Sequence, residues 1–299
     1  MKNYVIITDS SCNLTTEQKD KYGIAAIVPM HFYLDGKEYD ASGDWSEISA
    51  VEYYDRIRDG AKVRSSQASS YSYEETFRKY LEQGFDVLSL SCAEALSSSV
   101  KESIAAAKRL EKDFPDAKIY CVDTYNCCYS LAMLVIEAAK RRDAGGTIDE
   151  VRDWVTEKRA CFNEVGTVDK LTYLRNAGRV GGAAAFFGGV FSVKPIIVYD
   201  ETGHNNAFEK VRGRRGSLER VADLIKEYAD IDANRHICIA HANCLEDAKT
   251  LGEMVKERFA GKEIHFEYGF IEPGIGSAVG PGTIIVGFFG DPQMRTLGK

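Results

Sequence analysis

The feature that most constrains the fold of this chain is an alternation of short apolar runs with longer segments of helical period. In the first half, the runs Tyr4–Thr8, Asp86–Ser91 and Lys118–Val122 are separated by amphipathic stretches and short polar links. Strands that alternate with helices form βαβ units, in which the strands pair in parallel. We therefore expect an α/β fold whose first half is a mostly parallel sheet flanked by helices.

The second half continues the alternation of strand and helix patterns with a different amino-acid composition. Asp143–Gly146 is the best break in the first half, and a helix from Thr147 to about Asn163 could bridge two domains. Strand and helix patterns follow at 196–199, 217–230, 237–240, 245–259, 265–271 and 283–289. The segment Gly274–Gly282 reads as a glycine-rich loop, and it has neither nucleotide-loop pattern. A chain of 299 residues has room for two such α/β units.

Composition excludes several classes of function. Thirty-eight Lys and Arg against forty-five Asp and Glu give a net charge of −7, which argues against a nucleic acid partner. The longest small-and-apolar stretch, Gly181–Val193, is too short to span a bilayer, and the apolar run at the start is too short for a signal peptide. The eight cysteines form no CxxC pair and no zinc spacing, so we expect reduced thiols, no metal and a cytoplasmic protein.

Polar links at the ends of predicted strands are the candidate ligand-binding positions. Ser97, Ser98 and Ser99 open a helix directly after the strand Asp86–Ser91, and Ser65 with Ser66 supplies a second set of hydroxyls. Helix N-termini beyond the carboxyl ends of strands bind anions, so these hydroxyls suit a carboxylate or a phosphate. The alternative is that Ser97 only caps its helix, which is a common role for serine.

Two further segments have a functional and a structural interpretation. The run Gly182–Phe191 mixes small residues with Phe186, Phe187 and Phe191, and it could line an apolar channel or form a tightly packed core helix. The basic run Lys210–Arg215 could be a solvated surface or a docking patch for an acidic partner.

Catalytic motifs are mostly absent from the sequence. There is no GxSxG nucleophile elbow and no HExxH, and the five histidines are scattered. His241 ends a predicted strand and could approach a ligand, although a structural role fits equally well. Asp9, also at a strand end, could hold a site loop or cap the turn that follows it.

Taken in order, the motifs of this chain resemble those of the bacterial DegV family, whose members bind long-chain fatty acids. The resemblance covers nearly the whole chain, and no single motif carries it alone. The matching segments are Ile7–Ser11, Gly36 with Tyr39–Asp40, Ser65–Ser69, Leu96–Ser99, Leu171–Leu174, Gly178–Val180, Val193–Ile196, Val211–Arg212 and Gly280–Gly282.

The resemblance implies a two-domain fold and a fatty-acid site. Residues 1–160 would form an α/β domain that carries the carboxylate-binding serines, and residues 161–299 an α/β domain that contributes to the acyl tunnel. The ligand would be a long-chain fatty acid such as hexadecanoate or octadecenoate, with no cofactor. Hydroxyls carried over as Ser65 and Ser97, with Ser98 and Ser99 beside them, would hold the carboxylate.

The resemblance also implies a partner. Family members can present the bound acid to a separate fatty-acid kinase, so this chain would be a carrier and not an enzyme. Arg212, with Arg214 and Arg215, is then a candidate docking site for the kinase. The family often has a histidine near the head group where this chain has Ala278, and its loss weakens the case for phosphoryl transfer.

Two other functions remain open at the level of the sequence. A serine-dependent acyl hydrolase or transferase would need a base within reach of a serine, and only His241 is placed for that role. A regulatory or interaction module with an incidental cavity is the third hypothesis.

Overall fold

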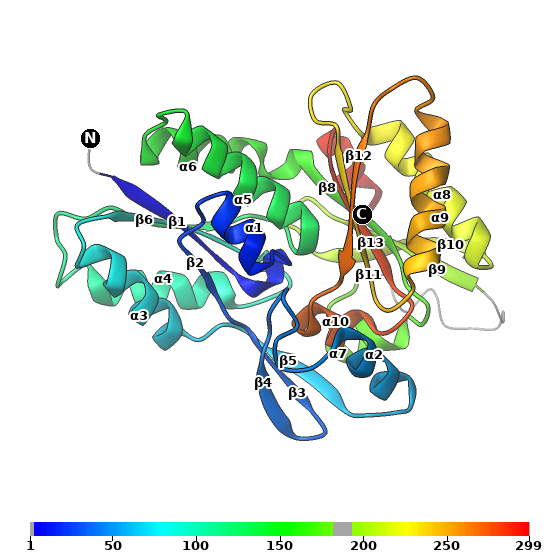
Figure 1. Cartoon of the computed structure of the whole chain (residues 1–299), viewed down its shortest axis with the longest axis horizontal. Coiled ribbons are helices and arrows are strands. Elements are labelled where there is room, and N and C mark those ends of the chain that lie inside the picture. Colours follow the sequence, from blue (N-terminus) through cyan, green and yellow to red (C-terminus); the bar gives the residue numbers. More distant parts are fainter. Residues whose placement is uncertain (1–2, 182–192, 299) are drawn as a thin grey trace.

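The structure is a computed structural model that describes residues 3–181 and 193–298 (Figure 1). Its first sheet has four parallel strands in the order β2-β1-β6-β7. The strands are β1 (Tyr4–Asp9), β2 (Ala26–Val28), β6 (Asp86–Ser91) and β7 (Ile119–Asp123). The central strand β6 is buried along its whole length, as expected for a parallel strand covered on both faces. The prediction of a parallel sheet in the first half is confirmed.

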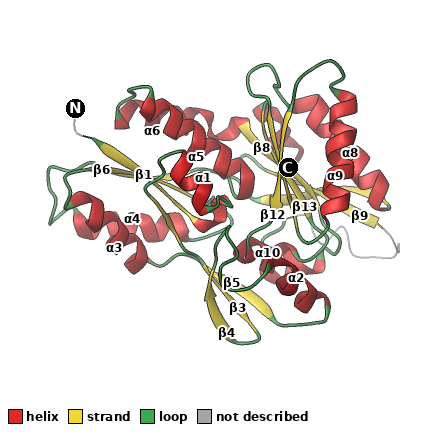
Figure 2. Ribbon diagram, in the orientation of Figure 1, coloured by secondary structure: helices red, strands yellow, loops and turns green. Residues whose placement is uncertain are grey.

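Helices cover this sheet on both faces (Figure 2). One layer is α3 (Ser70–Leu81) with α4 (Ser99–Leu110), and the other contains α5 (Cys128–Asp143) and α6 (Ile148–Lys158). The short helix α1 (Thr16–Lys21) begins with the capping box that Thr15 and Gln18 form.

A small antiparallel sheet projects beside the first one. Its order is β4-β3-β5, from β3 (His31–Leu34), β4 (Lys37–Asp40) and β5 (Val63–Ser66), and α2 (Ala50–Arg58) joins β4 to β5. Asp35 and Gly36 form the hairpin turn with φ of 51° and 87°, the positive values that such two-residue turns need.

The second half forms a six-stranded mixed sheet in the order β10-β9-β8-β13-β11-β12. Among the described strands of this sheet, only β11 and β12 pair in parallel. The helices α8 and α9 pack together against this sheet, and α7 and α10 lie near the small sheet (Figure 1). The elements are β8 (Phe162–Thr167), α7 (Thr172–Ala177), β9 (Val193–Tyr199), β10 (Asn205–Arg212), α8 (Arg214–Tyr228), β11 (His236–His241), α9 (Leu245–Arg258), β12 (His265–Phe270), α10 (Pro273–Val279) and β13 (Ile284–Phe289). Short 3-10 helices lie at Ser10–Cys12, Arg159–Cys161 and Pro292–Gly298.

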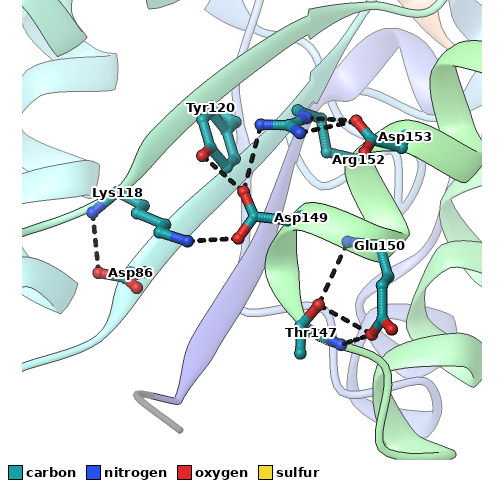
Figure 3. Close-up of polar contacts among 8 residues, drawn as sticks. All are labelled: Asp86, Lys118, Tyr120, Thr147, Asp149, Glu150, Arg152 and Asp153. Atoms are coloured by element: carbon teal, nitrogen blue, oxygen red, sulfur yellow. Dashed lines mark hydrogen bonds and ion pairs between the residues drawn. The ribbon is translucent and has the colours of Figure 1, made fainter.

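A polar cluster fixes the start of α6 to the first sheet (Figure 3). Thr147 and Glu150 form a reciprocal capping box, which satisfies backbone N–H groups at the helix N-terminus. Asp149 accepts hydrogen bonds from Lys118 and from the Tyr120 hydroxyl, the latter at 2.7 Å. This anchor holds the helix that leads into the second sheet.

One apolar cluster extends across the two large sheets, and the second sheet packs in a further cluster with α8 and α9. Helix α5 contacts β1 of the first sheet and β8, β11 and β13 of the second. Ile7 and Ile285, one from each sheet, belong to the same buried cluster. We propose the boundary between residues 160 and 161 because β8, the first strand of the second sheet, begins at Phe162.

Five of the sequence-based predictions of elements need correction. The helix after Gly146 ends at Lys158, and the buried strand β8 follows it where helix was predicted to about Asn163. β10 was not predicted, and α8 begins at Arg214, three residues before its predicted start. Ser65 and Ser66 end the strand β5, where a polar link was expected. The glycine-rich segment begins as the helix α10.

Candidate ligand-binding site

A deep cavity lies where the three sheets meet. It encloses about 1020 Å³ of space that is not filled by atoms, part of which is open to solvent. Its walls come from the loops after β1 and β6, from the strands β5, β8 and β9, and from the helix α10. The residues that line it include Ser11, Met30, Ser65, Ser97, Ser98, Cys92, Cys127, Glu164, Gly166, Leu174, Ile197, Tyr199, Ile275, Val279 and Ile285.

Three of the predicted serines line this cavity, and its opening lies beside the exposed Ser98. Ser65, at the end of β5, and Ser97 with Ser98, at the start of α4, all line it. Segments that are far apart in the sequence thus place their hydroxyls around one space. Ser99 is fully buried behind them and does not line the cavity. The structure therefore brings three of the four predicted serines to the cavity surface.

Ser97 makes hydrogen bonds within its own turn. Its Oγ lies 2.9 Å from the Oγ of Ser99 and accepts the Ser99 backbone N–H at 3.3 Å. The N-cap residue Ser98 makes no capping bond through its side chain. Ser97 thus contributes to capping, as the structural interpretation expected. Its hydroxyl still lines the cavity beside the N-terminus of α4, where the helix dipole favours a negative charge.

A cation at the opening was not assigned a role from the sequence. Arg179 is exposed, lines the same cavity, and donates from Nε to the Leu96 carbonyl oxygen at 3.1 Å. This bond places its side chain beside the segment that carries Ser97. Its position in the Gly178–Val180 motif was the only signal in the sequence. A guanidinium beside hydroxyls strengthens the preference of this opening for an anion.

The inner part of the cavity is largely apolar, with a few buried titratable groups. Glu164 is only 8% exposed, and burial raises its pKa to about 8, although Tyr199 and Arg295 act in the opposite direction. The thiol of Cys92 beside that of Cys127, together with burial, raises the pKa of Cys127 well above its usual range. Glu164 and Cys127 are therefore neutral near pH 7 and add little negative charge to the cavity.

Helix α10 forms one wall and is held by a buried carboxyl group. Glu272 accepts the backbone N–H groups of Gly274 at 2.8 Å and Ile275 at 2.6 Å, and burial raises its pKa to about 8. The hydroxyls of Tyr53 and Tyr54 donate to backbone carbonyls at the start of the helix. The chain can therefore turn into a helix here despite its glycines, and α10 presents its side chains to the cavity.

Two polar residues considered from the sequence have structural roles. Asp9 accepts the backbone N–H groups of Ser11 at 3.1 Å and Cys92 at 2.9 Å, so it fastens the loop after β1 to the loop after β6. His241 is 2% exposed, and burial lowers its pKa to about 4. It packs on the ring of Phe270 and does not line the cavity. The base that the hydrolase hypothesis required is therefore not at this site.

The remaining predicted positions lie elsewhere. Phe186 and Phe187, with Phe191, fall outside the described residues. Arg212 and Arg215 are exposed, whereas Arg214 forms an ion pair with Asp247 of α9 at 2.9 Å.

Within the described ranges, no three His, Cys, Asp or Glu side chains gather as ligands for a metal ion. None of the helices in the same ranges has the length and apolarity that crossing a membrane requires.

The fold and the site together define a class of α/β proteins in which three sheets enclose one cavity with hydroxyl groups at its opening. The family model that matches residues 3–291 describes an uncharacterised protein of the DegV family. A DegV domain-containing protein of Clostridium perfringens is 34% identical over 294 residues, which are 98% of this chain and 99% of that protein. The chain belongs to the DegV family, which confirms the family predicted from the sequence motifs.

Solved structures share this fold. A stearic acid-binding protein from Eubacterium ventriosum matches with a TM-score of 0.85 and 24% identity, over 97% of this chain and 99% of that one. A DegV family protein from Thermus thermophilus, described by its fatty acid binding, matches with a TM-score of 0.83 and 24% identity, over 97% and 100%. The predicted α/β architecture of the DegV type is therefore confirmed.

Proposed function

We propose that this chain binds a long-chain fatty acid, such as hexadecanoate or octadecenoate, and holds its carboxylate at the opening of the cavity. The observation that carries the proposal is the division of the lining of one cavity between polar groups, which include Ser65, Ser97 and Arg179, and buried apolar side chains. Solved relatives of the same fold from E. ventriosum and T. thermophilus are described as fatty-acid binding. An amphiphile with an anionic head and an apolar tail matches this division.

Burial of the tail would supply most of the affinity. Each CH₂ group transferred from water to an apolar environment contributes about 0.8 kcal/mol. The carboxylate would accept hydrogen bonds from the serine hydroxyls and the N-terminus of α4, and Arg179 would add a charge-assisted bond. In this arrangement the carboxylate determines the orientation of the fatty acid, and burial of its tail provides most of the affinity.

The test of the head-group site compares an acid with its alcohol. Ser97→Ala should weaken the binding of hexadecanoate by roughly tenfold or more, because it removes a hydrogen bond to a charged group. The affinity for hexadecanol, which has no carboxylate, should change by less than about threefold, since a neutral hydrogen bond contributes less. Isothermal titration calorimetry with both ligands makes the measurement.

The matched control is Ser103→Ala on the same helix. The Ser103 hydroxyl is buried, donates to the Val100 carbonyl at 2.8 Å and does not line the cavity. This variant should bind both ligands like the parent protein. An equal loss for acid and alcohol in Ser97→Ala would remove Ser97 from the carboxylate site.

The finer part of the proposal is that the chain is a carrier that presents the bound acid to a separate fatty-acid kinase. It is supported by the lining of the cavity, which does not include His241 and so leaves the serines without that base, and by the exposed side chains of Arg212 and Arg215. The kinase would transfer the γ-phosphoryl group of ATP to the carboxylate and so form an acyl-phosphate and ADP. We place this carrier in the cytoplasm, where its eight free cysteines would stay reduced.

A further inference from the structure

The inner part of the cavity contains two neighbouring polar groups for which carboxylate binding at the opening has no use. The register of β8 against β9 pairs Val165 with Val198. One residue further along the two antiparallel strands, Glu164 lies beside Tyr199, and both side chains line the cavity. They come from the second sheet, whereas the serines of the opening come from the first sheet and the small sheet. The cavity therefore has polar groups in two separate places.

Tyr199 brings an unpartnered hydroxyl to this place. The residue is 1% exposed, and its Oη makes no hydrogen bond of normal geometry with any residue that the structure describes. Buried tyrosine hydroxyls usually have a partner, because leaving a polar group unsatisfied after its removal from water is costly. The Tyr199 hydroxyl, whose polar neighbour on this wall is the Glu164 carboxyl group, is therefore available to a ligand atom.

Glu164 supplies a complementary group. Within the described chain its carboxyl group accepts a long hydrogen bond, 3.4 Å, from the Ser130 hydroxyl, and the neighbouring Tyr199 hydroxyl is close enough to lower its pKa. With its pKa raised to about 8 by burial, the carboxyl group is protonated at neutral pH and offers both a donor and an acceptor. The nearby guanidinium of Arg295 is occupied by backbone carbonyls and by the side chain of Asn126, to which it donates at 2.8 Å. It therefore makes no ion pair that would satisfy Glu164.

We propose that Tyr199 and Glu164 form a second polar subsite, which accepts a hydroxyl group carried on the acyl chain of the ligand. This inference rests on the proposed fatty-acid function and names the class of acid: a long-chain hydroxy fatty acid. The tyrosine O–H would donate to the alcohol oxygen, and the alcohol O–H would donate to the carbonyl oxygen of Glu164. A site built to bind a hydroxyl group discriminates against an analogue that lacks it, because its own polar groups then stay unpaired.

The experiment uses a series of hydroxyhexadecanoates that differ only in the position of the hydroxyl group, with hexadecanoate as the reference. We expect one position, or two adjacent ones, to bind the parent protein about tenfold tighter than hexadecanoate, and the other isomers to bind more weakly because they bury an unpaired hydroxyl. Hydroxy acids that all bind more weakly than hexadecanoate would overturn the subsite alone. Failure of hexadecanoate and every isomer to bind would overturn the fatty-acid function as well.

Two variants connect the preference to the named side chains. Tyr199→Phe should abolish the preference for the hydroxy acid, and a circular dichroism spectrum like that of the parent protein shows that the variant is folded. Glu164→Gln keeps an acceptor and a donor and should retain part of the preference. Tyr80→Phe is the control. It loses a hydrogen bond of 2.6 Å to the Ala25 carbonyl, and Tyr80 does not line this cavity. Retention of the full preference in Tyr199→Phe would contradict the assignment.

Discussion

Two buried glutamates contribute to the way in which the stability of this protein responds to pH. Burial raises the pKa values of Glu164 and Glu272 to about 8, although hydrogen bonds from neighbouring groups lower both pKa values. Each side chain has a different task, since Glu164 lines the cavity and Glu272 holds the first turn of α10. Both are therefore protonated in the folded protein at neutral pH, whereas the same groups ionise near pH 4.5 in an unfolded chain.

The free energy of unfolding should fall as the pH rises from about 6.5 to about 8. In this window the folded protein holds two protons that the unfolded chain has lost, so ionisation favours unfolding by about 1.4 kcal/mol per pH unit for each glutamate. Below pH 6.5 the buried His241, whose pKa is lowered to about 4, acts in the opposite direction, because the unfolded chain then binds the extra proton. Urea unfolding under reducing conditions at a series of pH values measures the slope.

Glu164→Gln tests the origin of this pH dependence. The amide cannot ionise, so the variant should lose the Glu164 share of the slope between pH 6.5 and 8 and keep that of Glu272. The same substitution at Glu257, an exposed position on α9, is the control and should leave the slope as in the parent protein. A free energy of unfolding that is flat or rises across this window would contradict the assignment of buried neutral carboxyls.

At the level of single residues, the sequence predicted the opening of the cavity better than its interior. Ser65 and Ser97 were identifiable because hydroxyls near a strand end or a helix start are a pattern that sequence alone displays. Glu164 and Tyr199 were not identifiable in this way. An acid and a tyrosine are usually taken as surface residues unless the strand that carries them is known to lie inside a sheet, as β8 and β9 do. Their environment is created by tertiary packing, which no local pattern records.

At the level of elements, the failures have a common cause. β8 reads Phe-Asn-Glu-Val-Gly-Thr, which is too polar to be recognised as a core strand, although all six residues are buried. α10 contains Gly274 and Gly276, which disfavour a helix, yet Glu272 caps it and a side chain at Gly276 would collide with the Tyr54 hydroxyl. By contrast, β6 and α4 were predicted correctly because local pattern and burial agree there.

The segment that joins β10 to α8 carries the proposed kinase-docking side chains. Arg212 is exposed, and Arg215, with 82% of its side chain exposed, forms a surface ion pair with Glu219 at 2.9 Å. Arg214 is less exposed, at 22%, and is paired with Asp247. Reversing both exposed charges with Arg212→Glu and Arg215→Glu should slow acyl-phosphate formation by a fatty-acid kinase and ATP at least tenfold. Charges at the rim of an interface act mainly on association, so the effect should shrink at high salt.

The affinity of this double variant for hexadecanoate should equal that of the parent protein, because neither arginine lines the cavity. Arg235→Glu, at another exposed position, is the control for a general change of charge. Acyl-phosphate formation at the parental rate in the double variant would show that this segment does not contact the kinase.

At the level of the whole molecule, the cavity exists only because three sheets are assembled around it. Its opening combines β5 of the small sheet with the start of α4, and its interior combines β8 and β9 with α10. The continuous core that joins the two large sheets holds these walls in place. The sequence indicated α/β units and the family, but the meeting of these distant segments follows from packing that only the complete fold defines.

The same assembly explains why ligand binding and stability should be linked. A fatty acid that binds the folded protein and not the unfolded chain stabilises the folded state in proportion to the logarithm of its concentration. The ligand would contact walls from all three sheets at once. A bound acid is therefore expected to survive purification.

The most direct test of the central claim is mass spectrometry of the purified protein, first under native and then under denaturing conditions. The account predicts one long-chain fatty acid per chain in the native spectrum, released on denaturation, and its mass would identify the acyl chain and any hydroxyl group on it. Protein that carries no fatty acid, and that takes up none when hexadecanoate or octadecenoate is added, would contradict the claim and leave only the fold.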